Sequence, residues 1–385
     1  MPTTEPLTAR VGFEVELLAP AGSSRRALAE RIALEHGGSV HRVLHVDSEP
    51  SLVPGMGQFW HLTPGYRIDD ATGTELATLV DDITIVEDIR RDQLAARCGE
   101  TGHQGCPLCR PEPDRDAFRI LSDDLRLLRL AGDTTGARTR FEHALDGIAR
   151  VFDVPVETVG AVRRVRDRAG ASIAMATAVA PGRERPCEIV TPPIRSGHAE
   201  ALEALLGPAR ALGFLVPVEA AVHLHLDAGP FRSVPAFANV VRLFTGYRSG
   251  LHAVLGTNPH CVRTGALPEA LTTVVDTESR SGADWPRLQE AVRTLGLTKY
   301  LDVNLTALLT DTPPRDTIEV RILPGMLDGE DITGRAAIVQ ALLERCLDPT
   351  PLPQPPRGVP SEEALLVLLA DARARQLQRI RPALA

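Results

Sequence analysis

Two short segments near opposite ends of the chain alternate apolar and charged residues, and this alternation constrains the fold more than any other feature. Near the N-terminus, Gly-Phe-Glu-Val-Glu places Glu14 and Glu16 on one face of a strand. Near the C-terminus, Thr-Ile-Glu-Val-Arg places Glu319 and Arg321 on one face in the same way. A period of two is typical of a strand with one polar face. Acidic side chains repeated on a sheet face repel one another unless cations gather there, so the pattern suggests a site for metal ions and phosphate. For either segment alone, an ordinary half-exposed strand is the alternative.

A third candidate strand covers residues 222–227, with the sequence Val-His-Leu-His-Leu-Asp. Its alternation puts His223, His225 and Asp227 on one face and three apolar side chains on the other. Three ligand-type side chains at alternate positions are a more specific signal than a lone histidine. A partly exposed strand is one alternative. Another is the His-x-His-x-Asp-His motif of metallo-β-lactamase-like hydrolases, although Ala228 stands where that motif has its last histidine.

Two further positions draw attention because of their surroundings. Glu188 lies in a short predicted strand, 186–190, and the Thr-Pro-Pro that follows makes the backbone rigid where the chain leaves this strand. Lys299 is the only lysine in the chain, and it precedes a predicted strand that contains Asn304. A lysine in such a place is a candidate to hold a phosphate or a carboxylate, and an ordinary surface lysine is the alternative.

The cysteines of the middle region form a cluster with the spacing of a metal site. Cys98, His103, Cys106 and Cys109 lie within a dozen residues, and glycines between them permit tight turns. The spacing predicts a small zinc knuckle within an inserted loop, 95–115, whose folding energy a structural Zn²⁺ would supply. Four ligands would close the site, so a structural zinc is favoured over a catalytic one. An irregular loop with free thiols and a redox Cys-x-x-Cys pair remain alternatives.

The order of the predicted elements favours an α+β fold. Asp-x-x-Gly turns at 70–73 and 167–170 predict two hairpins. Because several strands are polar on one face, we expect a largely antiparallel, curved sheet with helices packed on one face. The predicted strands, besides those named above, cover 40–46, 58–62, 300–305 and 317–323. The predicted helices cover about 23–36, 116–130, 139–152, 198–212, 235–255, 285–295, 331–346 and 361–380.

Composition excludes several classes of protein. The chain has 385 residues, of which 43% are hydrophobic and 24% charged, as in ordinary globular proteins. Its net charge of −8 argues against nonspecific binding to nucleic acid. No apolar run approaches the roughly 18 residues of a membrane span, and the N-terminus does not resemble a signal peptide. We therefore expect a cytoplasmic enzyme without nucleic-acid or membrane partners. The sequence does not predict an oligomeric state.

Taken in order, five motifs resemble one known family. They are Glu-x-Glu, Glu-Ile-Val-Thr-Pro-Pro, His-Leu-His-Leu-Asp, Lys-Tyr-Leu-Asp-Val-Asn-Leu and Glu-Val-Arg. In this order they resemble the amidoligases, a bacterial branch of the carboxylate–amine ligases that include glutamine synthetase and glutamate–cysteine ligase. The resemblance covers residues 11–19 and then roughly 185–345, and it does not include the cysteine cluster.

This resemblance implies a fold similar to the catalytic domain of glutamine synthetase, with one ligase-like domain over 1–385 and the Cys/His loop inserted in it. It implies that the polar face of the sheet holds ATP and Mg²⁺. The implied Mg²⁺ ligands are Glu14, Glu16, Glu188 and Glu319. The implied catalytic residues are Arg321, Glu319 and His225, with Arg321 on the transferring phosphate. The implied residues around the nucleotide or substrate are Lys299, Asn304, His223 and Asp227.

The chemistry of amide formation is consistent with this set of residues. A carboxylate does not react with an amine in water because oxide would have to leave, and ATP solves this by converting the carboxylate into an acyl phosphate. Such a reaction depends on positioning and on cations around the phosphates. We therefore expect an ATP- and Mg²⁺-dependent carboxylate–amine ligase acting on an amino acid or peptide and an amine. The alternatives are a nucleotide- or peptide-binding module without turnover, a zinc-dependent hydrolase, and a phosphotransferase whose stable product needs no amine acceptor.

Overall fold

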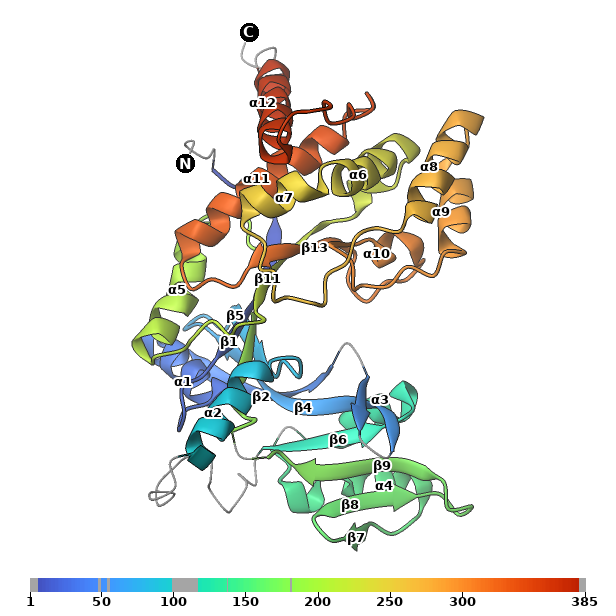
Figure 1. The fold of residues 1–385 in the computed structure, drawn as a ribbon. Coiled ribbons are helices and arrows are strands. Elements are labelled where there is room, and N and C mark those ends of the chain that lie inside the picture. The colour runs from blue at the N-terminus through green and yellow to red at the C-terminus, as the bar shows by residue number, and fades with distance from the viewer. Residues whose placement is uncertain are drawn as a thin grey trace. The chain divides into compact units, whose positions relative to one another are not determined.

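The structure is a computed structural model that describes residues 6–47, 50–53, 56–98, 117–136, 138–180 and 182–380. The chain is α+β, with a large antiparallel sheet that is not closed, which confirms the predicted class. The chain divides into two compact units (Figure 1). The first unit comprises residues 1–15, 191–206 and 218–385, and the second comprises residues 16–190 and 207–217.

The first unit contains an antiparallel sheet in the order β12, β13, β11, β1. These strands are β12 (Val303–Asn304), β13 (Thr317–Pro324), β11 (Ala221–Asp227) and β1 (Val11–Leu18), of which residues 11–15 belong to this unit. One face of the sheet is apolar because Phe13, Leu224 and Val320 lie opposite one another in the register and are all buried. Their burial leaves the alternate positions of the same strands to form the polar face.

Helices make up most of the rest of the first unit. They are η3 (Gly229–Phe231), α6 (Val234–Gly246), α7 (Arg248–Leu255), α8 (Glu269–Ser281), α9 (Trp285–Arg293), α10 (Thr306–Leu309), α11 (Gly329–Cys346) and α12 (Ser361–Ile380), while α5 (His198–Ala211) begins in this unit and ends in the second. Helix α6 packs on α8 and α11, and α12 packs on α7 and α11. Among the described residues, no helix combines the length and the apolar composition that crossing a membrane requires.

Two predicted elements of the first unit differ from the structure. The helix predicted at 235–255 is interrupted at Tyr247, which ends α6 and begins α7 with φ −104° and ψ 12°. Tyr247 is buried and its hydroxyl donates a hydrogen bond to the Pro353 carbonyl, so tertiary packing overrides the continuous helical pattern. The strand predicted at 300–305 is shortened to β12, because the chain before it bends and buries the Asp302 side chain.

The second unit contains an antiparallel sheet built around the long strand β4. Strands β10 (Pro186–Val190), β5 (Glu75–Val80), β4 (Gly57–Asp69), β6 (Phe118–Ser122), β9 (Ser172–Ala178), β8 (Val162–Arg166) and β7 (Glu157–Val159) follow one another in the sheet, and β2 (Ser39–Val46) and β3 (Ser51–Val53) also pair with β4. Both predicted hairpins are confirmed, since β4 pairs with β5 and β8 pairs with β9. Gly73 and Gly170 adopt the positive φ values that these turns require.

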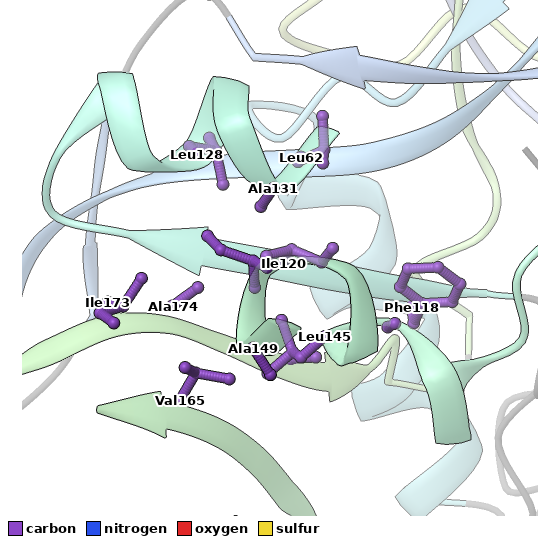
Figure 2. Packing of buried hydrophobic residues seen from close by; sticks show 13 residues of the cluster. Leu62, Phe118, Ile120, Leu128, Ala131, Leu145, Ala149, Val165, Ile173 and Ala174 are labelled. Carbon is purple, nitrogen blue, oxygen red and sulfur yellow. The ribbon is translucent and has the colours of Figure 1, made fainter. Parts of the chain in front are cut away.

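The second unit also contains the helices α1 (Arg25–Glu35), α2 (Glu87–Cys98), α3 (Leu125–Thr134), η2 (Phe141–His143) and α4 (Asp146–Phe152). Leu62 and Ile120 of the sheet pack with Leu128 of α3 and Ile148 of α4 in a buried hydrophobic cluster, part of which Figure 2 shows. The helix predicted at 116–130 is wrong in its first part, which is strand β6. Its alternating residues bury one face of a sheet, and the helix begins only after Asp124, whose carboxylate accepts the Arg126 amide at its start.

Candidate functional site

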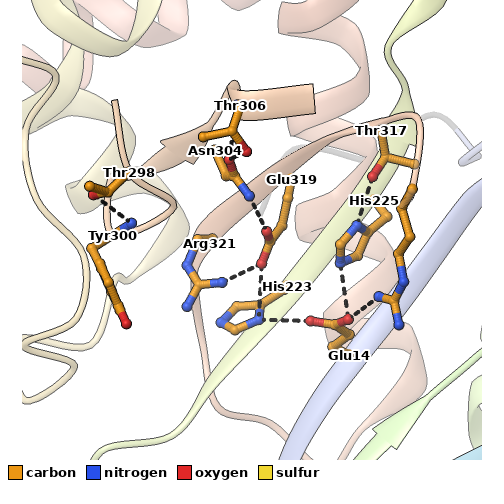
Figure 3. A network of polar contacts seen from close by, with 11 residues as sticks. Glu14, His223, His225, Thr298, Tyr300, Asn304, Thr306, Thr317, Glu319 and Arg321 are labelled. Carbon is orange, nitrogen blue, oxygen red and sulfur yellow. Dashed lines mark hydrogen bonds and ion pairs between the residues drawn. The ribbon is translucent and has the colours of Figure 1, made fainter. Parts of the chain in front are cut away.

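The polar face of the first unit gathers the acidic and histidine residues of three strands. In the register of the sheet, Glu14 on β1 lies opposite His223 on β11, and His225 on β11 lies opposite Glu319 on β13. Residues that pair across antiparallel strands point to the same face, so all four side chains meet there (Figure 3). Gly12 lies opposite His225, and a Cβ at this position would be 3.5 Å from the Cβ of His225.

The four side chains are close enough to form one network. Nδ1 of His223 is 3.2 Å from Oε2 of Glu14 and 3.5 Å from Oε1 of Glu319. Nε2 of His225 is 3.2 Å from Oε1 of Glu14. The segments 12–16 and 317–321 therefore lie in one sheet and are joined through β11, as the sequence hypothesis requires.

Further side chains surround this network and hold it in place. The amide of Asn304 donates to Oε2 of Glu319 at 2.8 Å, and Arg321 forms an ion pair with Oε1 of the same carboxylate. Arg315 forms an ion pair with Oε1 of Glu14. Thr317 is the hydrogen-bond partner of Nδ1 of His225, at 2.9 Å, which orients the imidazole so that Nε2 faces Glu14 (Figure 3).

Both carboxylates are ionised despite their burial. Burial raises the pKa of Glu14, but its hydrogen bonds and charge interactions with His223 and His225 outweigh this and hold that pKa well below its ordinary value. Burial also raises the pKa of Glu319, and the opposing attraction of Arg321 and His223 lowers it overall. A buried acid that stays charged is suited to bind a cation.

The residues present fit a divalent cation. Glu14, His225 and Glu319 each offer one ligand atom, and these atoms all lie within 4.8 Å of one another. Carboxylate oxygens are the ligands that Mg²⁺ prefers, and imidazole nitrogen extends the set to Mn²⁺ and Zn²⁺. The side chains of Glu14 and Glu319 are only 13% and 8% exposed, so a bound cation would be shielded from water on several sides.

Four other predicted site residues lie at further positions of the described chain, and they are Asp227, Lys299, Glu16 and Glu188. Asp227 is exposed and its carboxylate accepts the Gly229 amide, so the structure does not group it with His223 and His225 as a set of metal ligands within the described residues. Lys299 lies 5.8 Å from the centre of the Tyr300 ring. The predicted ligands Glu16 and Glu188 belong to the second unit, on β1 and β10, where Glu16 is buried and Glu188 is half-buried.

The predicted zinc cluster lies outside the described residues. His103, Cys106 and Cys109 are not described, and Cys98 ends α2 with its side chain not described. The knuckle at 95–115 stays a prediction.

Two groups of residues were missed by the sequence hypothesis. Arg315 and Thr317 precede Glu319 and Arg321 at alternate positions of the same segment. A period-two pattern that begins at residue 315 is the signal that could have predicted them. Asp302 is buried, and its carboxylate lies 2.7 Å from Nε of Arg248 and 2.9 Å from Nε2 of His252. Its carbonyl accepts the Arg321 amide, so this ion cluster anchors the chain beside β13. No local pattern could predict that arrangement.

The fold and this network define a class of protein in which an antiparallel sheet presents buried glutamates, histidines and an arginine on one polar face. A family model described as "Putative amidoligase enzyme" matches residues 7–343. Because that match covers most of the chain, the protein belongs to this amidoligase family, which confirms the family that the motifs resemble. Comparison with curated proteins and with solved structures found no match.

Proposed function

We propose that the protein is an ATP- and Mg²⁺-dependent ligase that joins a carboxylate to an amine. The observation that carries this proposal is the convergence of Glu14, His225 and Glu319, with Arg321 paired to the same Glu319 carboxylate. Membership of the amidoligase family indicates ligase activity and implies the use of ATP. The nature of the carboxylate, an amino acid or a peptide, is an expectation from that family.

Glu14, His225 and Glu319 would hold the divalent cation. Such a cation, when bound, supplies positive charge to phosphate oxygens. In the protein as described, Arg315 and Arg321 already pair with the two carboxylates, so positive charge is favoured at this position. We propose that Glu16 and Glu188 are further ligands, and that His223, Asn304, Asp227 and Lys299 line the nucleotide or substrate pocket.

The proposed reaction has two covalent steps. A substrate carboxylate oxygen attacks the γ-phosphorus of ATP, the new O–P bond forms as the bridging P–O bond breaks, and ADP leaves. The amine nitrogen then attacks the acyl carbon, phosphate leaves with the original carboxylate oxygen, and the nitrogen loses a proton. Charge accumulates on phosphate oxygens in the first step and on the departing phosphate in the second.

The described residues match the charge that develops. The guanidinium of Arg321 is 5% exposed and presents a planar set of donors suited to phosphate oxygens. Its ion pair with Glu319, which Asn304 also binds, fixes where those donors lie. Preorganised donors of this kind stabilise a transition state without reorganisation at the moment of reaction.

The test combines binding and turnover. The purified protein with ATP, Mg²⁺ and a panel of amino acids and amines should release ADP and phosphate only when both an acid and an amine are present. Glu319→Gln should lower turnover by roughly 10²–10³-fold and weaken Mg²⁺ binding measured by calorimetry. Glu269→Gln, on the exposed start of α8, is the matched control and should change neither quantity.

The outcomes separate this proposal from its alternatives. Absence of nucleotide binding by calorimetry would contradict it. Binding of an ATP analogue without product from any substrate pair would instead favour a binding module. A stable phosphorylated product formed without an amine would favour a phosphotransferase.

A further inference from the structure

Two arginines pair with the buried carboxylates of the first unit, and they differ in how far they are buried. Arg321 forms an ion pair with Oε1 of Glu319, and its side chain is only 5% exposed. Arg315 forms an ion pair with Oε1 of Glu14, and its side chain is 51% exposed although that of Glu14 is only 13% exposed. The proposed reaction uses the buried arginine and gives the half-exposed one no step.

The backbone around Arg315 is anchored, so its side chain is the part that can change position. Pro314 comes directly before it and has a restricted φ. Asp316 comes directly after it, where its carbonyl accepts the Ala228 amide and its carboxylate pairs with Arg232. Exposed side chains change rotamer rapidly. Arg315 can therefore exchange its partner by rotation about side-chain bonds, without a change in the sheet.

The oxygen that Arg315 contacts is the one through which Glu14 reaches the candidate cation site. Oε2 of Glu14 faces Nδ1 of His223 at 3.2 Å, whereas Oε1 lies 3.2 Å from Nε2 of His225 (Figure 3). Thr317 is the partner of Nδ1 of His225, which leaves Nε2 as the ligand atom of that ring. A cation bound by both Glu14 and His225 would therefore lie beside Oε1.

The guanidinium and a divalent cation compete for this oxygen. Their positive charges repel each other, and the repulsion is stronger where burial lowers the local dielectric, as it does around Glu14. The guanidinium of Arg315 carries a single charge and is half exposed. A divalent cation carries twice that charge and would be bound by Glu14, His225 and Glu319 together. The cation is therefore favoured at Oε1, and its binding displaces the guanidinium.

The pair of Arg321 and Glu319 is held in place by its surroundings. Arg321 is buried, and its backbone amide donates to the Asp302 carbonyl at 3.0 Å. Oε2 of Glu319 accepts the Asn304 amide at 2.8 Å. When a cation binds, this arginine stays beside its carboxylate, so the network then has one fixed guanidinium and one that has been released.

A released guanidinium is suited to bind an anion at the same position. Nη1 of Arg315 reaches Oε1 of Glu14, so an anion attached to a cation at that oxygen lies within reach of the same side chain. The planar donors of arginine match the oxygens of a phosphate.

We propose that Arg315 is a displaceable counter-ion of Glu14. A divalent cation takes its place at Oε1, and the guanidinium then binds an oxygen of the phosphate chain that the cation holds. The displacement is argued from the contacts of the first unit alone. The choice of a nucleotide phosphate as the new partner rests on the proposed ligase function.

The first test measures binding of the metal alone to the full chain. Mg²⁺ and Mn²⁺ are titrated by calorimetry into wild type, Arg315→Gln and Arg315→Lys. Arg315→Gln should bind either cation roughly 3- to 10-fold more tightly than wild type, because no guanidinium has to leave Glu14. Arg315→Lys keeps the charge without the planar donors and should lie between the two. Weaker or unchanged binding in Arg315→Gln would overturn the proposal.

Arg287→Gln is the matched control for the loss of one positive charge. Arg287 is 64% exposed and pairs with Glu278, which is 15% exposed, so this pair is buried to nearly the same degree as that of Arg315 and Glu14. Neither control residue belongs to the metal-binding groups found among the described residues. The control should bind both cations as wild type does. An equal gain in both variants would overturn the proposal, because net charge alone would then explain it.

The second test measures binding of the β,γ-imido analogue of ATP at saturating Mg²⁺. Arg315→Gln should bind this analogue roughly 10-fold more weakly than wild type, because a neutral amide cannot replace a charge-assisted hydrogen bond to phosphate. Arg315→Lys should recover part of that loss. Metal affinity and nucleotide affinity thus change in opposite directions, which damage to the fold would not produce.

The two tests separate this proposal from the ligase function. Tighter metal binding with unchanged analogue binding in Arg315→Gln would overturn the transfer of the guanidinium to phosphate. If wild type binds no analogue, the ligase proposal and that transfer fail together. The metal titrations, which contain no nucleotide, still decide in that case whether the cation displaces Arg315.

Discussion

The two units place buried acids in opposite electrostatic surroundings. In the first unit, Glu14 and Glu319 lie in one network with two histidines and two arginines, and the pKa of each acid is lowered. In the second unit, three arginines surround Asp81, and the pKa of the nearby Asp47 is raised. Burial opposes ionisation at all these positions, so the direction of each shift depends on hydrogen bonds and charges at close range. The first network is therefore suited to a cation, whereas in the second the three guanidinium groups are held by a buried carboxylate.

The largest effect should come from removing the centre of the second network. Asp81→Ala leaves three buried guanidinium groups without their carboxylate and should lower the free energy of unfolding by about 3–5 kcal/mol. Urea denaturation followed by circular dichroism measures this. Glu290→Ala is the control, because its side chain is 71% exposed in an ion pair with Arg293 within one helix, and it should change stability little. Equal effects of the two variants would contradict the role given to Asp81.

The next effect concerns the first network. Arg321→Gln should reduce kcat by roughly 10²–10³-fold, about 3–4 kcal/mol in the barrier, because a neutral amide cannot replace a charged donor to phosphate. Steady-state assays of ADP release measure this change. Arg335→Gln on α11 is the control, since the described contacts of its guanidinium are with the Leu255 carbonyl and with Asp331. A rise in KM at unchanged kcat would argue against a transition-state role.

The opposite pKa shifts predict opposite dependences of stability on pH. The folded-state pKa of Glu14 is lowered, so its contribution is present above about pH 4.3, the usual value for glutamate, and is lost as pH falls through its folded pKa. The stability of the Glu14→Gln variant should therefore fall less steeply than that of wild type as the pH is lowered. Thermal unfolding between about pH 3 and pH 7 measures this, and an unchanged profile would contradict the pairing with the histidines.

Asp47 should behave in the reverse way. Its folded-state pKa is raised, so its contribution is fully present below about pH 3.9, the usual value for aspartate, and is lost as pH rises through the folded pKa. Asp47→Asn should therefore stabilise the protein near pH 7 relative to wild type and have little effect at acid pH. The same unfolding series tests this, and a destabilised variant at neutral pH would show that Asp47 is ionised in the folded protein.

The smallest effect should come from Thr317, which orients His225. Thr317→Val keeps the shape of the side chain and should weaken Mg²⁺ binding roughly 10-fold, the lower end for residues that position a metal ligand. Calorimetry with the metal alone measures it. Thr277→Val is the control, because its exposed hydroxyl bonds only to a carbonyl of its own helix. Equal affinities in both variants would mean that His225 does not bind the cation.

Much of the first network could be predicted because it follows from strand alternation. Period two places Glu14, His223, His225 and Glu319 on polar faces, and no other secondary structure would do so. Asp227 obeys the same alternation but lies at the exposed end of β11, where its carboxylate is engaged by a local turn. Alternation predicts on which face of the sheet a side chain lies, but it does not predict how far that side chain is buried.

The second network could not be predicted in the same way. Arg119 lies in a segment that the sequence predicts as a helix. On a helix its side chain would lie on the surface, without contact to Asp81. The other two arginines around Asp81, Arg25 and Arg183, come from the start of α1 and from the chain before β10, each many residues away. Contacts of this kind arise only when the strands pair, and single-sequence patterns carry no information about them.

Local pattern was therefore enough to establish an α+β chain, its two hairpins, and the faces on which the ligand-type residues of β1, β11 and β13 lie. Short-range periodicity encodes these features, because a strand exposes alternate side chains whatever its partners are. The convergence of Glu14 with Glu319, the supporting contacts of Arg315 and Thr317, and the arginine cluster around Asp81 depend on which strands become neighbours. That choice is made by burial of the apolar faces across the whole unit, so only the tertiary structure decides it.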